Sequence, residues 1–280
     1  MKTAIFSDIH GNTPALEAVL ADIRQHQVDR LFILGDIINE VDPHGCVALL
    51  SNWRSTENAP VSCIKGNAEL YLLTPDLDVI PNRGEAWEKE ILALIRWYYE
   101  KLTQADLNWI ASLPDYLVLN GTCLVHDSPI DRLAPETWHA AGIDPKYQEW
   151  FYHAPGVAET LPDDGWQKLL DFMDGHHFSR LFCGHTHCSF LRRFGSRIVC
   201  NAGSVGAPLD GDPRAAWVLL EEQPGDEPTI TIRRVHYDIA AILRLVDDAI
   251  DYPDFQRPGY REAYKHWRST GIYTRFRRGA

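Results

Sequence analysis

Long apolar segments are missing from this sequence. No run approaches the roughly 18 consecutive apolar residues that a membrane-spanning helix needs, although 45% of the 280 residues are hydrophobic. The opening Met-Lys-Thr-Ala is compatible with the start of a signal peptide, but the apolar stretch that follows is short and Asp8 interrupts it. We therefore expect no membrane span and a cytoplasmic location.

Positive charge is also scarce. The chain has 27 Lys and Arg against 39 Asp and Glu, which gives a formal net charge of -12. A protein that binds polyanions without sequence preference needs a basic face that releases counterions from the phosphate backbone. The charge excludes that class, and we expect no sequence-specific nucleic-acid partner. Small phosphates stay open as ligands, because bound metal cations can supply the positive charge.

Cysteine pairs with the spacing of a zinc or redox motif are absent. The six cysteines show no Cys-x-x-Cys spacing, and four of them lie in or beside apolar runs typical of strands. This placement favours reduced, buried thiols over disulfides or a thiolate zinc site. The cysteines are Cys46, Cys63, Cys123, Cys183, Cys188 and Cys200.

The early part of the chain has the alternating pattern of an α/β fold. Short apolar runs at 2–7, 31–34 and 61–64 predict strands, and the spacing of apolar residues over 13–25 and 43–53 predicts helices between them. Strands that alternate with helices indicate a mostly parallel sheet. The length allows one large α/β domain or two small ones.

The later part of the chain is more varied. Asn120-Gly121 between two apolar runs is a strong signal for an antiparallel hairpin. Residues 127–178 are less regular, and we interpret them as an excursion that shapes a pocket wall, although their aromatic residues would equally cover a sheet. Residues 251–280 are predicted to be a solvated C-terminal surface segment. We favour a single domain over 1–280, because polar clusters from Asp8 to His187 must converge.

Polar residues follow the predicted strands at their carboxyl ends, where functional groups gather in open α/β sheets. Their carboxylate, amide and imidazole groups suit two borderline first-row divalent ions such as Mn, Fe, Zn, Co or Ni. Calcium would need mostly oxygen ligands, and structural zinc would need thiolates. The candidate metal ligands are Asp8, His10, Asp36, Asn67, His126, His185 and His187.

These clusters resemble the motifs of the calcineurin-like metallophosphoesterase family, in its small bacterial type. The loop at 201–206, Asn-Ala-Gly-Ser-Val-Gly, is similar to the glycine-serine loop of those members. The resemblance extends to about Tyr237, and the motifs together are highly specific. In the family's order, the matching stretches are Asp8-Ile9-His10-Gly11-Asn12, Gly35-Asp36, Gly66-Asn67, His126 and Gly184-His185-Thr186-His187.

The resemblance implies a fold and a division of the ligands. The fold is a four-layer α/β/β/α sandwich of two mixed sheets flanked by helices. Asp36 would bridge two divalent ions, with Mn the best suited for an assay. The first ion would have Asp8, His10, Asp36 and His187 as ligands, and the second would share Asp36 and add Asn67, His126 and His185.

Two ions account for the expected chemistry. A water that bridges them loses a proton near neutral pH and becomes the nucleophile, and the same ions neutralise the phosphate oxygens during in-line displacement. We therefore predict hydrolysis of a small phosphate mono- or diester by metal-bridged hydroxide, without a phosphoenzyme.

The sequence departs from the family at the position of the general acid. Many members have Gly-Asn-His followed by an acidic residue, and that histidine is thought to protonate the leaving oxygen, whereas this chain has Ala68 and Glu69 after Asn67. General acid catalysis contributes roughly 10² to 10⁴ in rate. We expect slow turnover of alkyl phosphates and faster turnover of aryl esters or anhydrides. Glu69 and His44 are the candidate replacements, although a surface role near a helix start is the more ordinary interpretation of His44.

Two asparagines beside the motifs, Asn12 and Asn39, are candidate substrate contacts. The run at 35–40, Gly-Asp-Ile-Ile-Asn-Glu, lacks the Asp-Arg-Gly signature of the Ser/Thr protein phosphatases and dinucleoside polyphosphate hydrolases that share this fold. The arginine that would bind a substrate phosphate is therefore absent. Those two activities remain alternatives that the sequence does not favour.

A contrary interpretation is a non-catalytic or weakly active metal-binding scaffold, because one retromer subunit has this fold and acts as an interaction surface. Ala68 favours that interpretation. The complete set of ligands favours an enzyme, because a scaffold has no physical need for four imidazoles and three oxygens around a charged pocket. The sequence names neither the substrate nor the oligomeric state.

Overall fold

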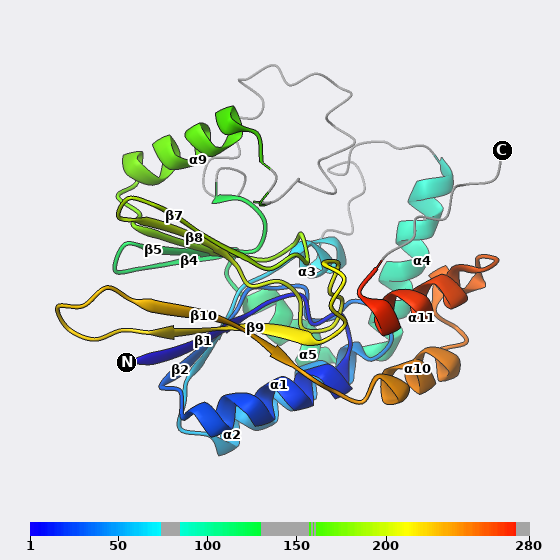
Figure 1. The fold of residues 1–280 in the computed structure, drawn as a ribbon. Helices are drawn as coiled ribbons and strands as arrows, with labels where there is room; N and C mark the ends of the chain where they lie inside the picture. Colours follow the sequence, from blue (N-terminus) through cyan, green and yellow to red (C-terminus); the bar gives the residue numbers. More distant parts are fainter. Residues whose placement is uncertain (74–84, 130–156, 158, 160, 273–280) are drawn as a thin grey trace.

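The structure is a computed structural model of the 280-residue chain. It describes residues 1–73, 85–129, 157, 159 and 161–272. Two five-stranded sheets face each other, and helices cover their outer faces (Figure 1).

The first sheet has the order β10-β9-β1-β2-β3. Its strands β1, β2 and β3 are parallel, whereas β9 is antiparallel to both β1 and β10. The parallel part corresponds to the three strands predicted from the early apolar runs. The strands are β1 (Lys2–Phe6), β2 (Arg30–Ile33), β3 (Val61–Cys63), β9 (Ala215–Glu221) and β10 (Thr229–Val235).

The second sheet has the order β4-β5-β6-β8-β7 and is also mixed. Strands β5, β6 and β8 are parallel, and β4 and β7 are antiparallel edge strands. The turn between β4 and β5 has φ of 49° at Asn120 and 72° at Gly121, as a two-residue hairpin requires. The strands are β4 (Tyr116–Leu119), β5 (Thr122–Val125), β6 (Arg180–Cys183), β7 (Phe190–Phe194) and β8 (Arg197–Asn201).

Helices α1 and α2 cover the outer face of the first sheet, and α9 covers the outer face of the second (Figure 1). No helix in the described part of the chain is long and apolar enough to cross a membrane. The helices are α1 (Thr13–His26), α2 (Pro43–Thr56), α3 (Asn67–Leu73), α4 (Glu85–Lys101), α5 (Gln104–Ser112), α9 (Asp163–Gly175), α10 (Ile239–Asp248), the 3₁₀ helix η2 (Pro253–Gln256) and α11 (Tyr260–Thr270).

The alternation of side chains along β1 divides the apolar core. Ala4 and Phe6 pack on the helix side of the sheet, with residues of α1 and α2. Ile5 points the other way and packs between the sheets, in one cluster with Leu124 of the second sheet. A third cluster joins the second sheet to α9 through Trp166. These layers confirm the predicted α/β/β/α sandwich.

The described C-terminal part of the segment 127–178 is more regular than predicted. Residues 163–175 form α9, whose buried side chains recur at helical spacing. This pattern was present in the sequence, but the prolines around it obscured the signal. The predicted pocket wall over 130–156 lies outside the described residues. The buried side chains of α9 are Trp166, Leu169, Leu170 and Met173.

The prediction of a solvated segment over 251–280 is wrong for residues 251–272. Helix α11 contributes to the core, and Arg268 is only 1% exposed. Tyr260, Tyr264 and Trp267 have the i, i+4, i+7 spacing of a helix face that packs against protein. Residues 273–280 lie outside the described part. The buried aromatic residues of this segment are Tyr252, Phe255, Tyr264 and Trp267.

Candidate metal centre

The loops that follow five parallel strands meet where the two sheets adjoin, and they bring the predicted ligands together. Each residue lies at or just beyond the carboxyl end of its strand, which is the usual functional edge of an α/β sheet. Asp8 and His10 follow β1, Asp36 follows β2, Asn67 follows β3, His126 follows β5, and His185 and His187 follow β6.

The backbone of these loops is strained at the ligand positions. Non-glycine residues rarely adopt a positive φ, and such residues cluster at functional sites. Five of the nine non-glycine residues with positive φ in the described chain are predicted ligands. They are Asp8 (56°), His10 (52°), Asp36 (51°), His185 (67°) and His187 (58°).

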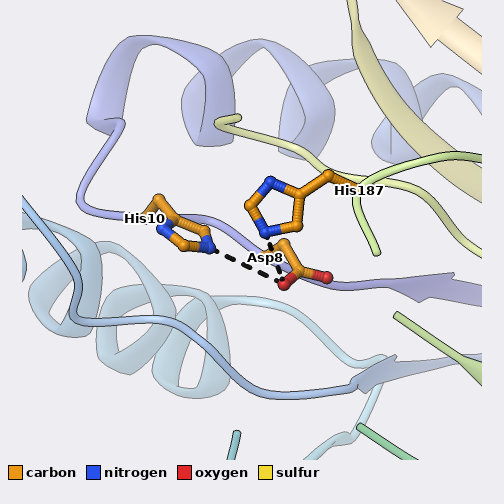
Figure 2. A group of neighbouring side chains, drawn as sticks. All are labelled: Asp8, His10 and His187. Atoms are coloured by element: carbon orange, nitrogen blue, oxygen red, sulfur yellow. Dashed lines mark ion pairs between the residues drawn. The ribbon is translucent and has the colours of Figure 1, made fainter. Parts of the chain in front are cut away.

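Asp8, His10 and His187 form the first cluster (Figure 2). The Oδ1 atom of Asp8 lies 3.2 Å from Nε2 of His187 and 3.6 Å from Nε2 of His10. The two imidazole rings meet edge to face, with centroids 4.6 Å apart. Burial alone would raise the pKa of Asp8, but the imidazoles of His187 and His126 hold it well below its usual value. Asp8 is therefore an ionised carboxylate between two imidazole nitrogens.

The first cluster contains buried polar atoms without hydrogen-bond partners. Oδ1 of Asp8 and Nε2 of His10 are both buried and make no hydrogen bond, although each lies in an ion-pair contact within the site. Such atoms are costly in a folded protein unless something satisfies them. The carbonyl oxygen of Ala207 fixes the ring of His187, because it lies 2.6 Å from Nδ1. This contact leaves Nε2 facing Asp8. One carboxylate and two imidazole nitrogens with these orientations fit a divalent first-row metal.

Asn67, His126 and His185 form the second cluster. Oδ1 of Asn67 lies 3.0 Å from Nε2 of His126 and 2.9 Å from Nδ1 of His185. The other ring nitrogen of His126 lies 2.7 Å from the carbonyl oxygen of Leu34, which fixes the orientation of the ring. Burial, together with the neighbouring His126, lowers the pKa of His185 to about 4. His185 is therefore neutral at pH 7, which is the form that binds metals.

Asp36 lies between the two clusters. Its Oδ2 is 3.5 Å from Nε2 of His10, and its Oδ1 is 3.5 Å from Nε2 of His126. Oδ1 also accepts a hydrogen bond of 2.9 Å from the backbone N–H of Ala68. The two carboxylate oxygens thus point to different imidazoles, as a carboxylate that bridges two ions would.

Glu69 anchors the two loops that carry Asp36 and Asn67. Its carboxylate is completely buried and accepts backbone hydrogen bonds from Gly66 (2.7 Å), Asp36 (2.9 Å), Ile37 (2.8 Å) and Ile38 (3.3 Å). Both of its oxygens are engaged, so the predicted role as a proton donor does not fit. The sequence missed this role because the donors are backbone amides, which leave no side-chain pattern.

Replacing Glu69 by glutamine is expected to destabilise the fold by about 2 to 3 kcal/mol, because an amide NH₂ then faces backbone N–H donors in a buried position. Urea unfolding monitored by circular dichroism measures the loss. The matched control is Glu57→Gln, which removes a partly exposed partner of Arg24 and is expected to cost less than about 1 kcal/mol. Equal stability of the two variants would contradict the anchoring role.

The remaining predicted site residues lie around this centre in different ways. His44 Nδ1 lies 2.8 Å from Oδ2 of Asp106 on α5, and half of the His44 side chain is exposed, so the acid role stays a prediction for this residue. Asn12 is buried and caps α1 through the N–H of Ala15, and it also donates to the carbonyl of Gly206. We assign it to the helix cap rather than to substrate.

Asn39 lies beside the first cluster. Its Nδ2 is 3.3 Å from Nδ1 of His10, and its Oδ1 accepts a hydrogen bond of 3.0 Å from the hydroxyl of Tyr98. Contact with a substrate stays a prediction for this residue.

The loop at 201–206 supports the centre from the second sheet. Asn201 Nδ2 donates to the carbonyl of Gly184 at 2.7 Å, directly before His185. Ser204 Oγ donates to the carbonyl of Asp8 at 2.7 Å. The resemblance identified this loop but gave these two side chains no role. Both act on the backbone of ligand-bearing loops.

Comparison with known proteins gives consistent results. Residues 1–223 match the family described as calcineurin-like phosphoesterase superfamily domain. A relative from Methanocaldococcus jannaschii, named uncharacterized protein MJ0912, is 27% identical over 256 residues, which is 84% of this chain and 88% of that protein.

Two solved structures share the fold over nearly the whole chain. A metallophosphoesterase from Sphaerobacter thermophilus is 23% identical, with a TM-score of 0.64 over 97% of this chain and 99% of that one. The hypothetical protein PH1004 from Pyrococcus horikoshii is 18% identical, with a TM-score of 0.70 over 98% and 99% of the two chains. With the family match over most of its length, the chain belongs to the calcineurin-like phosphoesterase superfamily and is a metal-dependent hydrolase of phosphoesters.

Proposed function

We propose that the chain, as a single phosphoesterase domain over 1–280, is a dinuclear enzyme that hydrolyses a small phosphate ester. Asp36 carries the proposal, because its two oxygens each lie 3.5 Å from a different imidazole, one in each cluster. A carboxylate in this position is the natural bridge between two metal ions.

The assignment of ligands follows the clusters. When bound, the two ions would acidify a water molecule and neutralise the phosphate oxygens during in-line displacement. The chain's own contribution is to fix the ring nitrogens. Carbonyl oxygens hold Nδ1 of His187 and Nδ1 of His126, so that Nε2 of each ring faces a carboxylate. Asp8, His10, Asp36 and His187 would hold the first ion, and Asp36, Asn67, His126 and His185 would hold the second.

The absence of the family's general-acid histidine restricts the class of substrate that we propose. Ala68 occupies the position of that histidine and is 2% exposed. Its side chain has no proton to donate, both oxygens of Glu69 accept backbone hydrogen bonds, and one ring nitrogen of His44 is paired with Asp106. We propose that the substrate has a leaving group that departs without protonation, such as an aryl phosphate or an anhydride. A metal-free scaffold is not favoured, because it would leave the buried atoms Oδ1 of Asp8 and Nε2 of His10 without hydrogen bonds. A metal-binding scaffold without activity is distinguished by the hydrolysis test below.

Hydrolysis of model esters tests the proposal. We expect the purified chain to release p-nitrophenol from p-nitrophenyl phosphate or from its bis ester when Mn is added. A chelator should stop the reaction, and fresh Mn should restore it. The relative rates of the two esters would decide between monoesterase and diesterase activity. A chain that binds two equivalents of Mn but hydrolyses neither ester, nor any member of a wider ester panel, would overturn the proposal.

A further inference from the structure

Helix α11 packs against the first metal cluster, although it lies beyond residue 223, where the family match ends. The ring of Trp267 stacks on the ring of His187, with an interplanar angle of 18° and centroids 6.2 Å apart. Trp267 Nε1 also donates a hydrogen bond of 2.7 Å to the carbonyl of Pro208. The loop after β6 is therefore in contact with the C-terminal helix, and that contact reaches a predicted ligand.

The neighbouring Arg268 is a buried cation. Its guanidinium lies over the rings of Tyr264 and Trp267, at 4.5 and 4.4 Å from their centroids. It donates hydrogen bonds to Glu40, to the carbonyl of Gly206 and to the hydroxyl of Tyr264. A buried guanidinium requires an acidic partner. Glu40, in the loop after Asp36, supplies that charge through Oε2.

The second oxygen of Glu40 faces the metal cluster. Its Oε1 lies 3.5 Å from Nδ1 of His10, and the backbone of Glu40 has a φ of 70°. Nε2 of His10 is the nitrogen that faces Asp8 and Asp36. An imidazole that binds metal through Nε2 carries its proton on Nδ1 and needs an acceptor there. The Nδ2 atom of Asn39 lies 3.3 Å from the same nitrogen, but an amide NH₂ can donate to it only in the tautomer without a proton on Nδ1. In the metal-binding tautomer, the carboxylate of Glu40 is the acceptor that the described residues place at this nitrogen.

We propose that α11 forms the outer wall of the first metal site, where Arg268 holds Glu40 and Glu40 positions His10 through Nδ1. The inference rests on the proposed function, because it concerns the same metal centre. Glu40 is a positioning residue here, since it acts on a ligand and not on the substrate. Partners of this kind typically change metal affinity by about 10- to 100-fold when they are removed.

Titration of the metal-free full chain with Co(II), followed by visible absorption and calorimetry, tests the proposal without relying on turnover. Glu40→Gln keeps an oxygen but loses the charge, and we expect about 10-fold weaker binding of one of the two equivalents. The double variant Glu40→Met with Arg268→Met has no carboxylate to accept the proton of His10 Nδ1, and it leaves no unpaired charge in the core. We expect about 100-fold weaker binding of that equivalent, with the other unchanged.

The stability of the variants, compared with their metal affinity, distinguishes a positioning role of Glu40 from a merely structural one. Glu40→Gln leaves Arg268 buried without its anion and should be the least stable variant, whereas the double variant should regain stability because an apolar pair replaces the ion pair. The order of metal affinity is therefore expected to differ from the order of stability. The inference would be overturned if metal affinity ranked the variants in the same order as their stability. It would also be overturned if the double variant bound metal with wild-type affinity.

A similar cluster elsewhere provides the control. Asp22 of α1 accepts hydrogen bonds of 2.9 Å from both Trp217 Nε1 and Arg233 Nε. Asp22 lies nine residues after the start of α1. This spacing places it about 14 Å along the helix from the end of α1 that follows the Asp8 and His10 loop. Asp22→Asn should leave both Co(II) equivalents unchanged, and a loss of affinity in this variant would contradict a local effect. A wild-type chain that binds no Co(II) would overturn the proposed function and this inference together.

Discussion

Replacing Asp36 by alanine is expected to abolish both phosphoester hydrolysis and the retention of metal. Asp36 is the side chain shared by the two clusters, with one oxygen toward His10 and the other toward His126. Its loss removes a ligand from each proposed ion at once. Metal charge contributes several kcal/mol to stabilising the transition state, so kcat/KM should fall by about 10³-fold or more.

Two measurements distinguish this outcome from unfolding. Metal content after gel filtration, determined by inductively coupled plasma mass spectrometry, should fall from two equivalents to less than one. Circular dichroism should show a folded chain. Asp36→Asn is the matched variant, because it keeps an oxygen that can accept the hydrogen bond from the N–H of Ala68. Activity retained by Asp36→Ala would mean that the catalytic site lies elsewhere.

The second large effect concerns the leaving group. Because Ala68 offers no proton, we expect kcat/KM to depend steeply on the leaving-group pKa. General acid catalysis contributes roughly 10² to 10⁴, so p-nitrophenyl phosphate should be hydrolysed at least about 10²-fold faster than an alkyl phosphate. A series of substituted phenyl phosphates and one alkyl phosphate, measured with the Mn-loaded chain, gives the slope directly.

His44 is the control residue for this prediction. Its imidazole contacts Asp106 on α5, so His44→Ala should leave the slope unchanged. A flat dependence in the wild-type chain would mean that another group protonates the leaving oxygen. A flat wild-type slope that becomes steep in His44→Ala would identify His44 as that group, against the structural role that its contact with Asp106 indicates.

The sequence predicted the fold because its local signals agree with one another. Apolar runs that end on polar residues identified the strands, and Asn120-Gly121 identified the hairpin between β4 and β5. These signals depend on near neighbours in the chain. The packing of one sheet on the other came from the family resemblance, and the parallel pairing of β6 with β8 was not predicted, because no local pattern encodes either of them.

The candidate ligands were recognisable because metal chemistry restricts residue type. Carboxylates and imidazoles that recur at successive strand ends are typical of a metal site, since the packing of a sheet does not require both groups there. The structure brings all seven together, in two clusters joined by Asp36. Their roles as ligands remain part of the proposed function.

The surroundings of the ligands were not predictable in the same way. Glu69 acts through four backbone amides, which no side-chain pattern reveals. Arg268 lies in the segment that was predicted to be solvated, because residue type alone does not distinguish an arginine that packs over two aromatic rings from one that is exposed to water. Its pairing with Glu40 spans 228 positions of sequence. Contacts of this kind require the folded chain.

The most direct test is a crystal of the Mn-loaded chain, measured at a wavelength where Mn scatters anomalously. Two peaks are expected on either side of the Asp36 carboxylate, about 3.5 to 4 Å apart. One should lie against Asp8, His10 and His187, and the other against Asn67, His126 and His185. A single peak, or peaks away from these residues, would contradict a dinuclear centre bridged by Asp36.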